Sequence, residues 1–386
     1  MSSQNVKVAV VRGETRRSAV SEALAALSED LRARIPAGAD VLVKPNLVSH
    51  KSQLPSTHVE ALSATLDGVF SAGAGSVLVA EGATDATAGF ERFGFRREAS
   101  QLPVRFLDLN RDEDAWEPIE LVGVHGERRI ARVSRTVASA RFRVSLALAK
   151  THVTSIVTLS LKNMLSSLHP DDRVMMHGFS GGGNGYQGWK RLVVEFLKGD
   201  DPSVRALTRF MGLAARFRNS MKDLSLRGAD PFEALAPKER AFLQSVEAMN
   251  RNLVALTRKV RPHLGIVDGF LGMHGEGPRH GTPFPLKTVI AGFDPVAVDA
   301  VASAIMGFNP DEIGYLHQAQ AAGLGICSLD AIEVVGEPIA RVRRVCRPHS
   351  NHRIQRHWRR LSDPSPRGPH LPHRATTSQG AEAGVP

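Results

Sequence analysis

Cysteine is almost absent from the sequence. Its 386 residues include two cysteines, Cys327 and Cys346, and no CxxC pair. This scarcity argues against thiolate zinc sites, ferredoxin-type iron–sulfur clusters and a disulfide framework. The chain is therefore expected to ligate no iron–sulfur cluster, and its cysteine usage fits a reducing compartment.

Long apolar runs are missing as well. No stretch approaches the ~18 consecutive apolar residues that a membrane-spanning helix needs. Residues 1–13 also lack the basic start and the apolar core of a signal peptide. The sequence therefore predicts no membrane span, and a cytoplasmic location is expected.

Acidic residues are scarce at the C-terminal end. The formal net charge of the chain is +10. Residues 341–386 hold ten arginines, no lysine and two acids, Asp363 and Glu382, so they contribute +8 of that charge. Because the segment is poor in apolar residues, it is predicted to be a disordered tail. The rest of the chain carries little net charge, and nucleic acid is not an expected partner of the core.

Short apolar strands alternate with amphipathic helices through most of the chain. Strands are predicted at 6–12, 40–44 and 76–82, with helices at 17–35 and 57–75 between them. Further strands are predicted at 104–108, 118–122 and 129–133, and in the segments FRVSLALAK, HLGIVDGF, LKTVIAGF and DAIEVVGE. The predicted fold class is α/β, with a largely parallel twisted sheet flanked by helices. Residues 1–340 are assigned to one such domain.

The strand pattern is interrupted between about residues 185 and 262. Segments such as SVRALTRFMGLAARFRNSMKDL have helical periodicity. Between Lys190 and Arg261 there are 15 Lys and Arg residues against 8 Asp and Glu residues. This composition predicts a helical insertion with a basic outer face.

Polar residues follow several of the predicted strands. Lys44 and Asn46 end one strand, Lys150 and His152 end another, and Asp268 follows a third. Open α/β sheets bind ligands at the carboxyl ends of their strands. We therefore expect these side chains to line one crevice.

Three lysines indicate an anion. Lys44, Lys150 and Lys162 come from separate elements, and burying several lysines without anionic partners is costly. Lys162 is the only charged residue between Lys150 and Asp171, so it is expected to be partly buried and paired. The neutralising groups are either acids of the protein (Glu81, Asp268, Glu276) or a carboxylate or phosphate ligand, and the sequence does not separate these alternatives.

Two further segments carry candidate residues. The loop DGFLGMHGEGPRHG offers Gly275 and Gly277 for a close approach of the backbone to a ligand, although it matches neither GxGxxG nor a P-loop. In FDPVAVDAVASAIMG, Asp294 suits a helix N-cap, and Gly307 suits the end of that helix. Asp299 lies inside this apolar helix and is either hydrogen-bonded in the core or an acid of the site.

Together these motifs resemble a known family. VKPNLV, STHVEAL, LAKTHVTSIVTLSLKNMLSSL, IVDGFLGMHGEGPRHGTP and AGFDPVAVDAVASAIMG occur in this order over roughly residues 6–336, which is similar to the family of the domain of unknown function 362. Many members carry an appended ferredoxin-type segment, and this chain lacks the cysteines for it. The resemblance implies a shared site without naming a reaction, and carries over these residues: Lys44, Asn46, Lys150, His152, Lys162, Asn163, His177, Asp268, Glu276 and Asp299.

The leading hypothesis is an enzyme that binds a small anionic substrate. Its catalytic candidates are His152, His177 and Lys162. Its substrate-binding candidates are Lys44, Asn46, Lys150, Asn163, Gly275 and Gly277. Asp268, Glu276 and Asp299 would orient the lysines or bind a divalent metal. Two alternatives stay open: a module that docks an acidic partner or nucleic acid through the basic insertion and tail, and a redox partner related to cluster-bearing family members.

Overall fold

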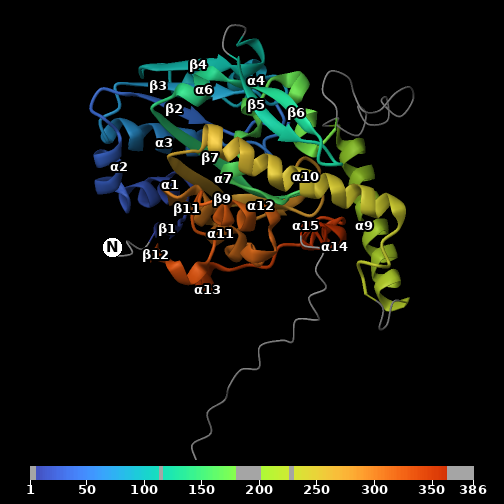
Figure 1. The fold of residues 1–386 in the computed structure, drawn as a ribbon. Helices are drawn as coiled ribbons and strands as arrows, with labels where there is room; N and C mark the ends of the chain where they lie inside the picture. Colours follow the sequence, from blue (N-terminus) through green and yellow to red (C-terminus); the bar gives the residue numbers. More distant parts are fainter. Residues whose placement is uncertain (1–5, 113–115, 180–200, 226–229, 363–386) are drawn as a thin grey trace, which may run out of the picture.

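A ten-stranded sheet forms the centre of the molecule (Figure 1). The computed structural model describes residues 6–112, 116–179, 201–225 and 230–362, with the backbone alone at 222–225. The strands of the sheet are β1 (Val6–Arg12), β2 (Asp40–Lys44), β3 (Ser76–Glu81), β4 (Val104–Asp108), β7 (Phe142–His152), β8 (Ile156–Thr158), β9 (Leu264–His274), β10 (Thr282–Phe284), β11 (Thr288–Gly292) and β12 (Ile332–Gly336).

Most strand pairs in this sheet are parallel. The order is β12-β1-β11-β9-β7-β2-β3-β4, and β9, β7, β2, β3 and β4 all run in the same direction. β11 is antiparallel to both of its neighbours. The short strands β8 and β10 pair antiparallel with β7 and β9, respectively. The predicted α/β class with a largely parallel sheet is therefore confirmed.

Helices cover both faces of the sheet. One face packs on α1 (Arg16–Ala25), α2 (Ser28–Arg34), α3 (Val59–Ser71), α4 (Ala86–Arg92) and α5 (Phe95–Glu98). The other packs on α10 (Pro237–Val260), α11 (Pro295–Ile305), α12 (Gly314–Ala321) and a hairpin of β5 (Trp116–Val122) and β6 (Arg128–Ser134). Successive residues of β7 point to opposite faces: Leu146 belongs to the first core and Ala147 to the second.

The ends of α11 follow the sequence signals. The side chain of Asp294 accepts hydrogen bonds from the backbone N–H of Val296 at 2.9 Å and of Ala297 at 3.1 Å. Pro295 occupies the first helical position, and Gly307 beyond the C-terminal end has a φ of 91°. This left-handed conformation favours glycine.

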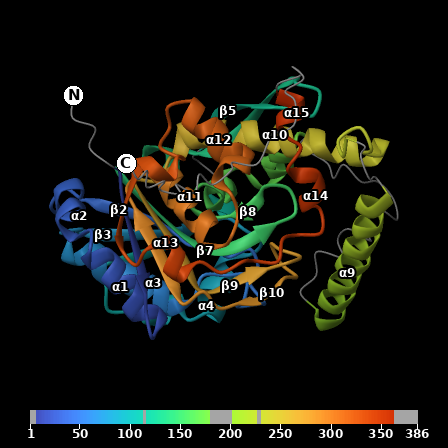
Figure 2. The same cartoon turned by 90° about the horizontal axis from the view of Figure 1, so that it is seen from below.

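The described part of the insertion consists of two long helices, α9 (Pro202–Ser225) and α10, while residues 185–200 lie outside the described residues. α10 packs on the core, whereas α9 lies at the periphery in both views (Figures 1 and 2). None of the helices in the described residues has the length and hydropathy needed to span a bilayer. The remaining helices are short: α6 (Arg135–Ser139), α7 (Ser160–Asn163), α13 (Ile339–Val342), α14 (His352–Gln355) and α15 (Arg359–Ser362).

The C-terminal segment differs from the prediction. A disordered tail was expected from residue 341, but residues 341–362 pack against the core, and 363–386 lie outside the described residues. Cys346, Ile354 and Trp358 are buried. The prediction failed here because a few well-spaced apolar side chains anchor a segment whose average composition is polar.

Candidate functional site

The carboxyl ends of neighbouring parallel strands meet at one edge of the sheet. β7, β2 and β3 are adjacent, and they end at His152, Lys44 and Glu81. This is the edge at which open α/β sheets bind ligands. The polar residues that the sequence places after these strands are thereby brought to one region.

Lys44 and Glu81 form a buried ion pair. Lys44 Nζ lies 3.0 Å from Glu81 Oε2, and both side chains are fully buried. The carboxylate also accepts hydrogen bonds from the backbone N–H of Leu47 at 3.2 Å, Gly82 at 2.6 Å and Ala83 at 2.8 Å, and from the Ser166 hydroxyl. Burial alone would raise the pKa of Glu81, but the charge of Lys44 and these donors lower it. Lys44 is therefore neutralised within the protein.

Lys150 has neutral hydrogen-bond partners. Its Nζ donates to Asn46 Oδ1 at 2.6 Å and to the carbonyl oxygen of Pro55 at 2.8 Å. Asn46 Nδ2 donates to Asn163 Oδ1 at 2.9 Å, and Asn163 Nδ2 donates to the carbonyl oxygen of Lys44 at 2.9 Å. The two amides thus connect the lysines of β2 and β7 in one buried network.

The environment of Lys150 is unfavourable for a positive charge. Burial, followed by the charges of Lys162 and Arg279, lowers its pKa well below the usual value. Glu81 opposes this effect but is already paired with Lys44. An anion bound beside Lys150 would relieve the repulsion.

Lys162 is buried, and the described residues give its side chain no partner. Its residue is 8% exposed, and within the described residues no hydrogen bond or ion pair joins its Nζ to another group. Burial lowers the pKa of Lys162 to about 7. The sequence led us to expect a pairing group for this lysine, and the described residues supply none.

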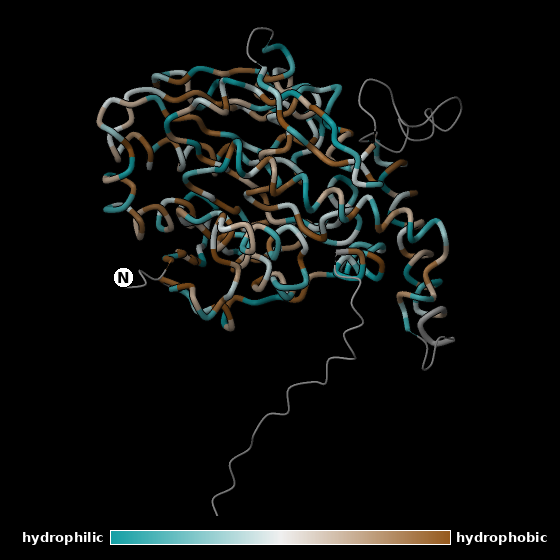
Figure 3. Tube along the Cα trace, in the orientation of Figure 1, coloured by the Kyte–Doolittle hydropathy of each residue, from teal (hydrophilic) through white to brown (hydrophobic). Residues whose placement is uncertain are grey.

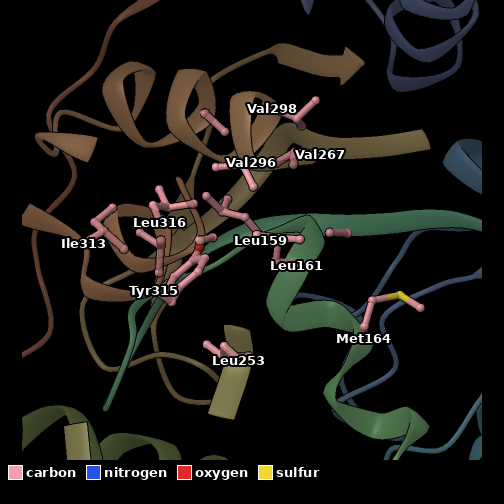
Figure 4. Close-up of a cluster of buried hydrophobic side chains, with 14 of the residues drawn as sticks. Leu159, Leu161, Met164, Leu253, Val267, Val296, Val298, Ile313, Tyr315 and Leu316 are labelled. Carbon is pink, nitrogen blue, oxygen red and sulfur yellow. The ribbon is translucent and has the colours of Figure 1, made fainter. Parts of the chain in front are cut away.

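Asp299 holds the single turn of α7 that carries Lys162. Its Oδ1 accepts from the backbone N–H of Ser160 at 2.8 Å and from the Ser160 hydroxyl at 2.5 Å. Its Oδ2 accepts from the backbone N–H of Leu161 at 3.1 Å and from the Tyr315 hydroxyl at 3.3 Å. Burial raises the pKa of Asp299 to about 7, against the effect of these donors. Figure 4 shows Leu161 and Tyr315 in the apolar packing around this turn.

The two candidate histidines lie together, with ring centroids 6.5 Å apart. His152 Nδ1 accepts from the backbone N–H of Thr154 at 3.0 Å and of Ser155 at 3.3 Å, so we assign its proton to Nε2. His177 Nδ1 lies 3.3 Å from the Thr154 hydroxyl oxygen. Burial and the charge of Lys162 lower the pKa of His177 to about 3 and that of His152 well below its usual value. Both rings are therefore neutral at physiological pH.

Gly275 and Gly277 pack against the end of β7. The carbonyl oxygen of Gly275 accepts a hydrogen bond from the Thr151 hydroxyl at 2.9 Å. Gly275 has a φ of 81°, and a Cβ at Gly277 would overlap the carbonyl oxygen of Thr151. Glycine is needed here for the close approach of the loop to the strand, beside Lys150 and His152.

Asp268 points elsewhere. Its Oδ2 accepts from Arg16 Nε at 2.9 Å, and its Oδ1 accepts from the backbone N–H of Phe270 at 2.9 Å. Burial raises its pKa, and Arg16 opposes the rise. Asp268 therefore neutralises an arginine of α1 and is not the partner of a site lysine.

Glu276 connects the loop to the insertion and the C-terminal segment. Its carboxylate lies 2.5 Å from Arg216 Nη1, 2.9 Å from the Ser350 hydroxyl and 3.2 Å from His349 Nε2. The three acids considered as metal ligands, Asp268, Glu276 and Asp299, thus have separate partners. Among the residues that the structure describes, no group of three or more His, Cys, Asp or Glu side chains is arranged to hold a metal ion.

Two contributors escaped the sequence prediction. Glu81 was considered as a neutralising acid but not chosen as a site residue, although it ends a strand next to β2. Gln355 lies in the segment predicted to be disordered, and its Nε2 donates to the carbonyl oxygen of His152 at 2.9 Å. The spacing of Ile354 and Trp358, four residues apart, was the available signal for helical structure around Gln355.

Comparison with known proteins identifies one family. The model of the domain of unknown function (DUF362) matches residues 41–304. No curated protein matches the chain. Two solved structures are similar at a TM-score of 0.41: a Thermotoga maritima protein at 10% identity, and the lactate racemase apoprotein of Thermoanaerobacterium thermosaccharolyticum at 12% identity. The matches cover 81% and 79% of this chain but only 60% and 58% of those chains.

Proposed function

This chain belongs to the DUF362 family, and we propose that it is an enzyme acting on a small anionic molecule. The substrate carries a carboxylate or a phosphate, which binds between Lys150 and Lys162 at the carboxyl edge of the sheet. The cytoplasmic location expected from the sequence stays a prediction.

One observation carries this proposal: the described residues leave Lys162 without a counter-charge. The carboxylate of Glu81 is paired with Lys44, and Lys150 is held by the neutral oxygens of Asn46 and Pro55. Burying cationic groups is costly unless an opposite charge compensates them. A bound anion would supply that charge to both Lys150 and Lys162.

The site residues have distinct chemical roles in this proposal. Lys150 is fixed by two hydrogen bonds and serves to bind the anion. Lys162, with a pKa of about 7, binds an anion when protonated and accepts a proton when neutral. His152 presents an N–H at Nε2, because its Nδ1 is occupied by two backbone donors. A lysine base and a histidine donor would together move protons on a bound substrate.

The test is ligand binding by a lysine variant. Small carboxylates and phosphates are screened by thermal shift against the full chain, and each hit is titrated by calorimetry. Lys162→Met removes the charge but keeps the apolar stem, so the fold should be retained while the affinity falls at least about tenfold. Lys51→Met, an exposed lysine in the neighbouring loop, is the matched control and should bind as the wild type does.

Unchanged binding by Lys162→Met, or an equal loss in Lys51→Met, contradicts the proposal. Salt distinguishes the docking of nucleic acid through exposed basic residues. Such binding weakens steeply with ionic strength, whereas binding to buried lysines is much less affected.

A further inference from the structure

The three buried lysines of the described residues differ in what their nitrogen atoms contact. Lys44 Nζ is held in an ion pair at 3.0 Å. Lys150 Nζ donates hydrogen bonds to two protein oxygens, at 2.6 and 2.8 Å. For Lys162 Nζ, the part of the chain that the structure describes supplies neither a hydrogen bond nor an ion pair. Among these three lysines, Lys162 is therefore the one whose nitrogen is available to another molecule.

Lys162 is also the most accessible of the three lysines. Its residue is 8% exposed, against 1% for Lys150 and 0% for Lys44. Its position is well defined, because Asp299 accepts hydrogen bonds from the backbone N–H groups of Ser160 and Leu161 in the same turn. A small molecule arriving from solvent therefore reaches the amine of Lys162 more readily than the other two.

The surroundings of Lys162 favour its neutral form. Hydrophobic stretches pass through the middle of the molecule (Figure 3), and the neighbours Leu161 and Met164 belong to one of the two cores. Burial lowers the pKa of Lys162 to about 7. At about pH 7.5 most of this amine is neutral, whereas an exposed lysine of ordinary pKa has about one neutral amine in a thousand. A desolvated lysine of this kind is an effective nucleophile toward a carbonyl group.

We propose that Lys162 forms an imine with a small carbonyl compound that also carries a carboxylate or a phosphate. This inference rests on the proposed function, in which the anionic group binds between Lys150 and Lys162. The neutral amine attacks the carbonyl carbon, so that a nitrogen–carbon bond forms and the carbon–oxygen bond breaks. Both hydrogens of the amine leave with the oxygen as water, and no oxidant or reductant takes part. The substrate class is thereby narrowed from small anions to anionic ketones and aldehydes.

Two neutral imidazole rings lie near the amine. The charge of Lys162 lowers the pKa of His152 and of His177, so both rings are within electrostatic reach of it. His152 presents its N–H at Nε2, because its Nδ1 accepts from two backbone donors. This N–H would stabilise the negative charge that develops on the carbonyl oxygen during the attack.

The experiment is reductive trapping with the full-length protein. Pyruvate and dihydroxyacetone phosphate are the two probes, and each is incubated with the protein at about pH 7.5 in the presence of cyanoborohydride, which reduces an imine to a stable amine. Intact-mass spectrometry should show one adduct per chain, and peptide mapping should locate it at Lys162. The probe that is trapped identifies the anionic group as a carboxylate or a phosphate.

Two further compounds separate the carbonyl from the anion. Lactate has a carboxylate but no ketone or aldehyde group, so it should form no adduct. Acetone has a carbonyl group but no charge, so its trapping should be at least about tenfold slower than that of the reactive probe.

Variants identify the nucleophile. Lys162→Met should form no adduct. Lys162→Arg keeps a positive charge without a nucleophilic amine, so it should also form no adduct while binding the anion more tightly than Lys162→Met does. Lys51→Met, at an exposed lysine, is the matched control and should be trapped as the wild type is. Circular dichroism melting checks that the variants remain folded.

Several results overturn the inference. They are the absence of an adduct with both probes, an adduct only at lysines other than Lys162, and trapping of acetone as fast as that of the probes. If Lys162→Met loses anion binding and neither probe is trapped, the imine is wrong and the proposed function stands. A wild-type chain that binds no carboxylate or phosphate in calorimetry contradicts the proposed function itself.

Discussion

At the scale of single residues, Lys44 and Lys162 illustrate two outcomes for a buried lysine. Lys44 pairs with Glu81, whose carboxylate has further donors from two loops. Lys162 lies on α7, a short distance along the same edge, and no described residue neutralises it. The first lysine is neutralised by a residue of the protein, whereas for the second we propose a bound anion.

The ion pair should be important for stability. Removal of one partner leaves a buried charge without compensation, which typically costs about 3–5 kcal/mol. We therefore expect Lys44→Met or Glu81→Gln to lower the urea midpoint strongly. The double variant Lys44→Met, Glu81→Leu should recover most of the loss, because no charge stays buried. Single variants as stable as the wild type would show that the pair is solvated.

The pKa of Lys162 gives a second prediction, on stability against pH. Its pKa is about 7 in the folded state and 10.5 in its ordinary state. Between these values the unfolded chain holds a proton that the folded chain has released, so the free energy of unfolding from this group rises with pH. Lys162→Met should remove that rise, and should be more stable than the wild type near pH 6.

Urea denaturation at several pH values between about 6 and 10, a range set by the two pKa values, measures this pH dependence of the free energy of unfolding. The wild type should also bind its anion more tightly below pH 7 than above pH 8, because the protonated lysine is the binding form. A wild-type and a Lys162→Met profile of identical slope would contradict the buried, unpaired state of the lysine.

At the scale of elements, α7 depends on a carboxylate from another helix. One turn of helix is too short to be stable by itself. Asp299 of α11 accepts four hydrogen bonds from Ser160, Leu161 and Tyr315, and so fixes the turn that carries Lys162 and Asn163. Asp299 thus acts as a positioning residue.

Asp299→Asn tests this role. The pKa of Asp299 rises from 3.8 to about 7 on folding, so the folded state keeps a proton that the unfolded state releases between these values. The free energy of unfolding therefore falls as pH rises through this window, and the asparagine variant should lack that fall. The variant should also bind the anion more weakly, because α7 loses acceptors for its backbone and side-chain donors.

Urea denaturation at pH 5 and pH 7, with calorimetric titration of the anion, measures both effects. Asp85→Asn at the N-cap of α4 is the matched control, since Asp85 caps a different helix from α7. Loss of the pH slope with unchanged anion affinity would leave Asp299 with a purely structural role.

Some parts of the site can be predicted from the sequence and others cannot. The strands β2, β7 and β9 and the cap of α11 follow from apolar runs and from Asp294, because those signals are local. The partners of Asp268 and Glu276 do not follow from local signals of this kind. Asp268 faces α1 because of the register of β9, and Glu276 meets Arg216 and Ser350 from segments distant in sequence. Strand order and facing side depend on tertiary packing, which the sequence pattern leaves open.

At the scale of the whole molecule, the C-terminal segment forms hydrogen bonds to parts of the chain that are distant in sequence. The backbone N–H of Cys346 bonds to the carbonyl oxygen of Met306 at 2.8 Å, and Trp358 Nε1 bonds to that of Glu312 at 2.8 Å. Between these anchors, Gln355 reaches the carbonyl oxygen of His152 at 2.9 Å. Residues 343–362 therefore include a direct contact with the backbone of a candidate site residue.

Two truncations test this connection. A chain ending at Ser362 should melt at the same temperature as the wild type, because the removed residues have little apolar content. A chain ending at Val342 loses the buried side chains of Cys346, Ile354 and Trp358. Each apolar side chain of this size contributes about 1.5–3 kcal/mol when buried, so the melting temperature should fall by many degrees.

The point variant Gln355→Ala distinguishes the contribution of the C-terminal segment to stability from its contribution to anion binding. Gln355 is fully buried and bonds to His152, whereas Arg356 beside it is exposed, so Arg356→Ala is the matched control. Gln355→Ala should weaken anion binding with only a modest loss of stability, because one hydrogen bond contributes about 1 kcal/mol. Melting temperature and anion affinity are measured for both variants.

These experiments have two contradicting outcomes. If the two truncations melt alike, the segment does not pack on the core in solution. If Gln355→Ala binds the anion as Arg356→Ala does, the segment supports the fold without shaping the site.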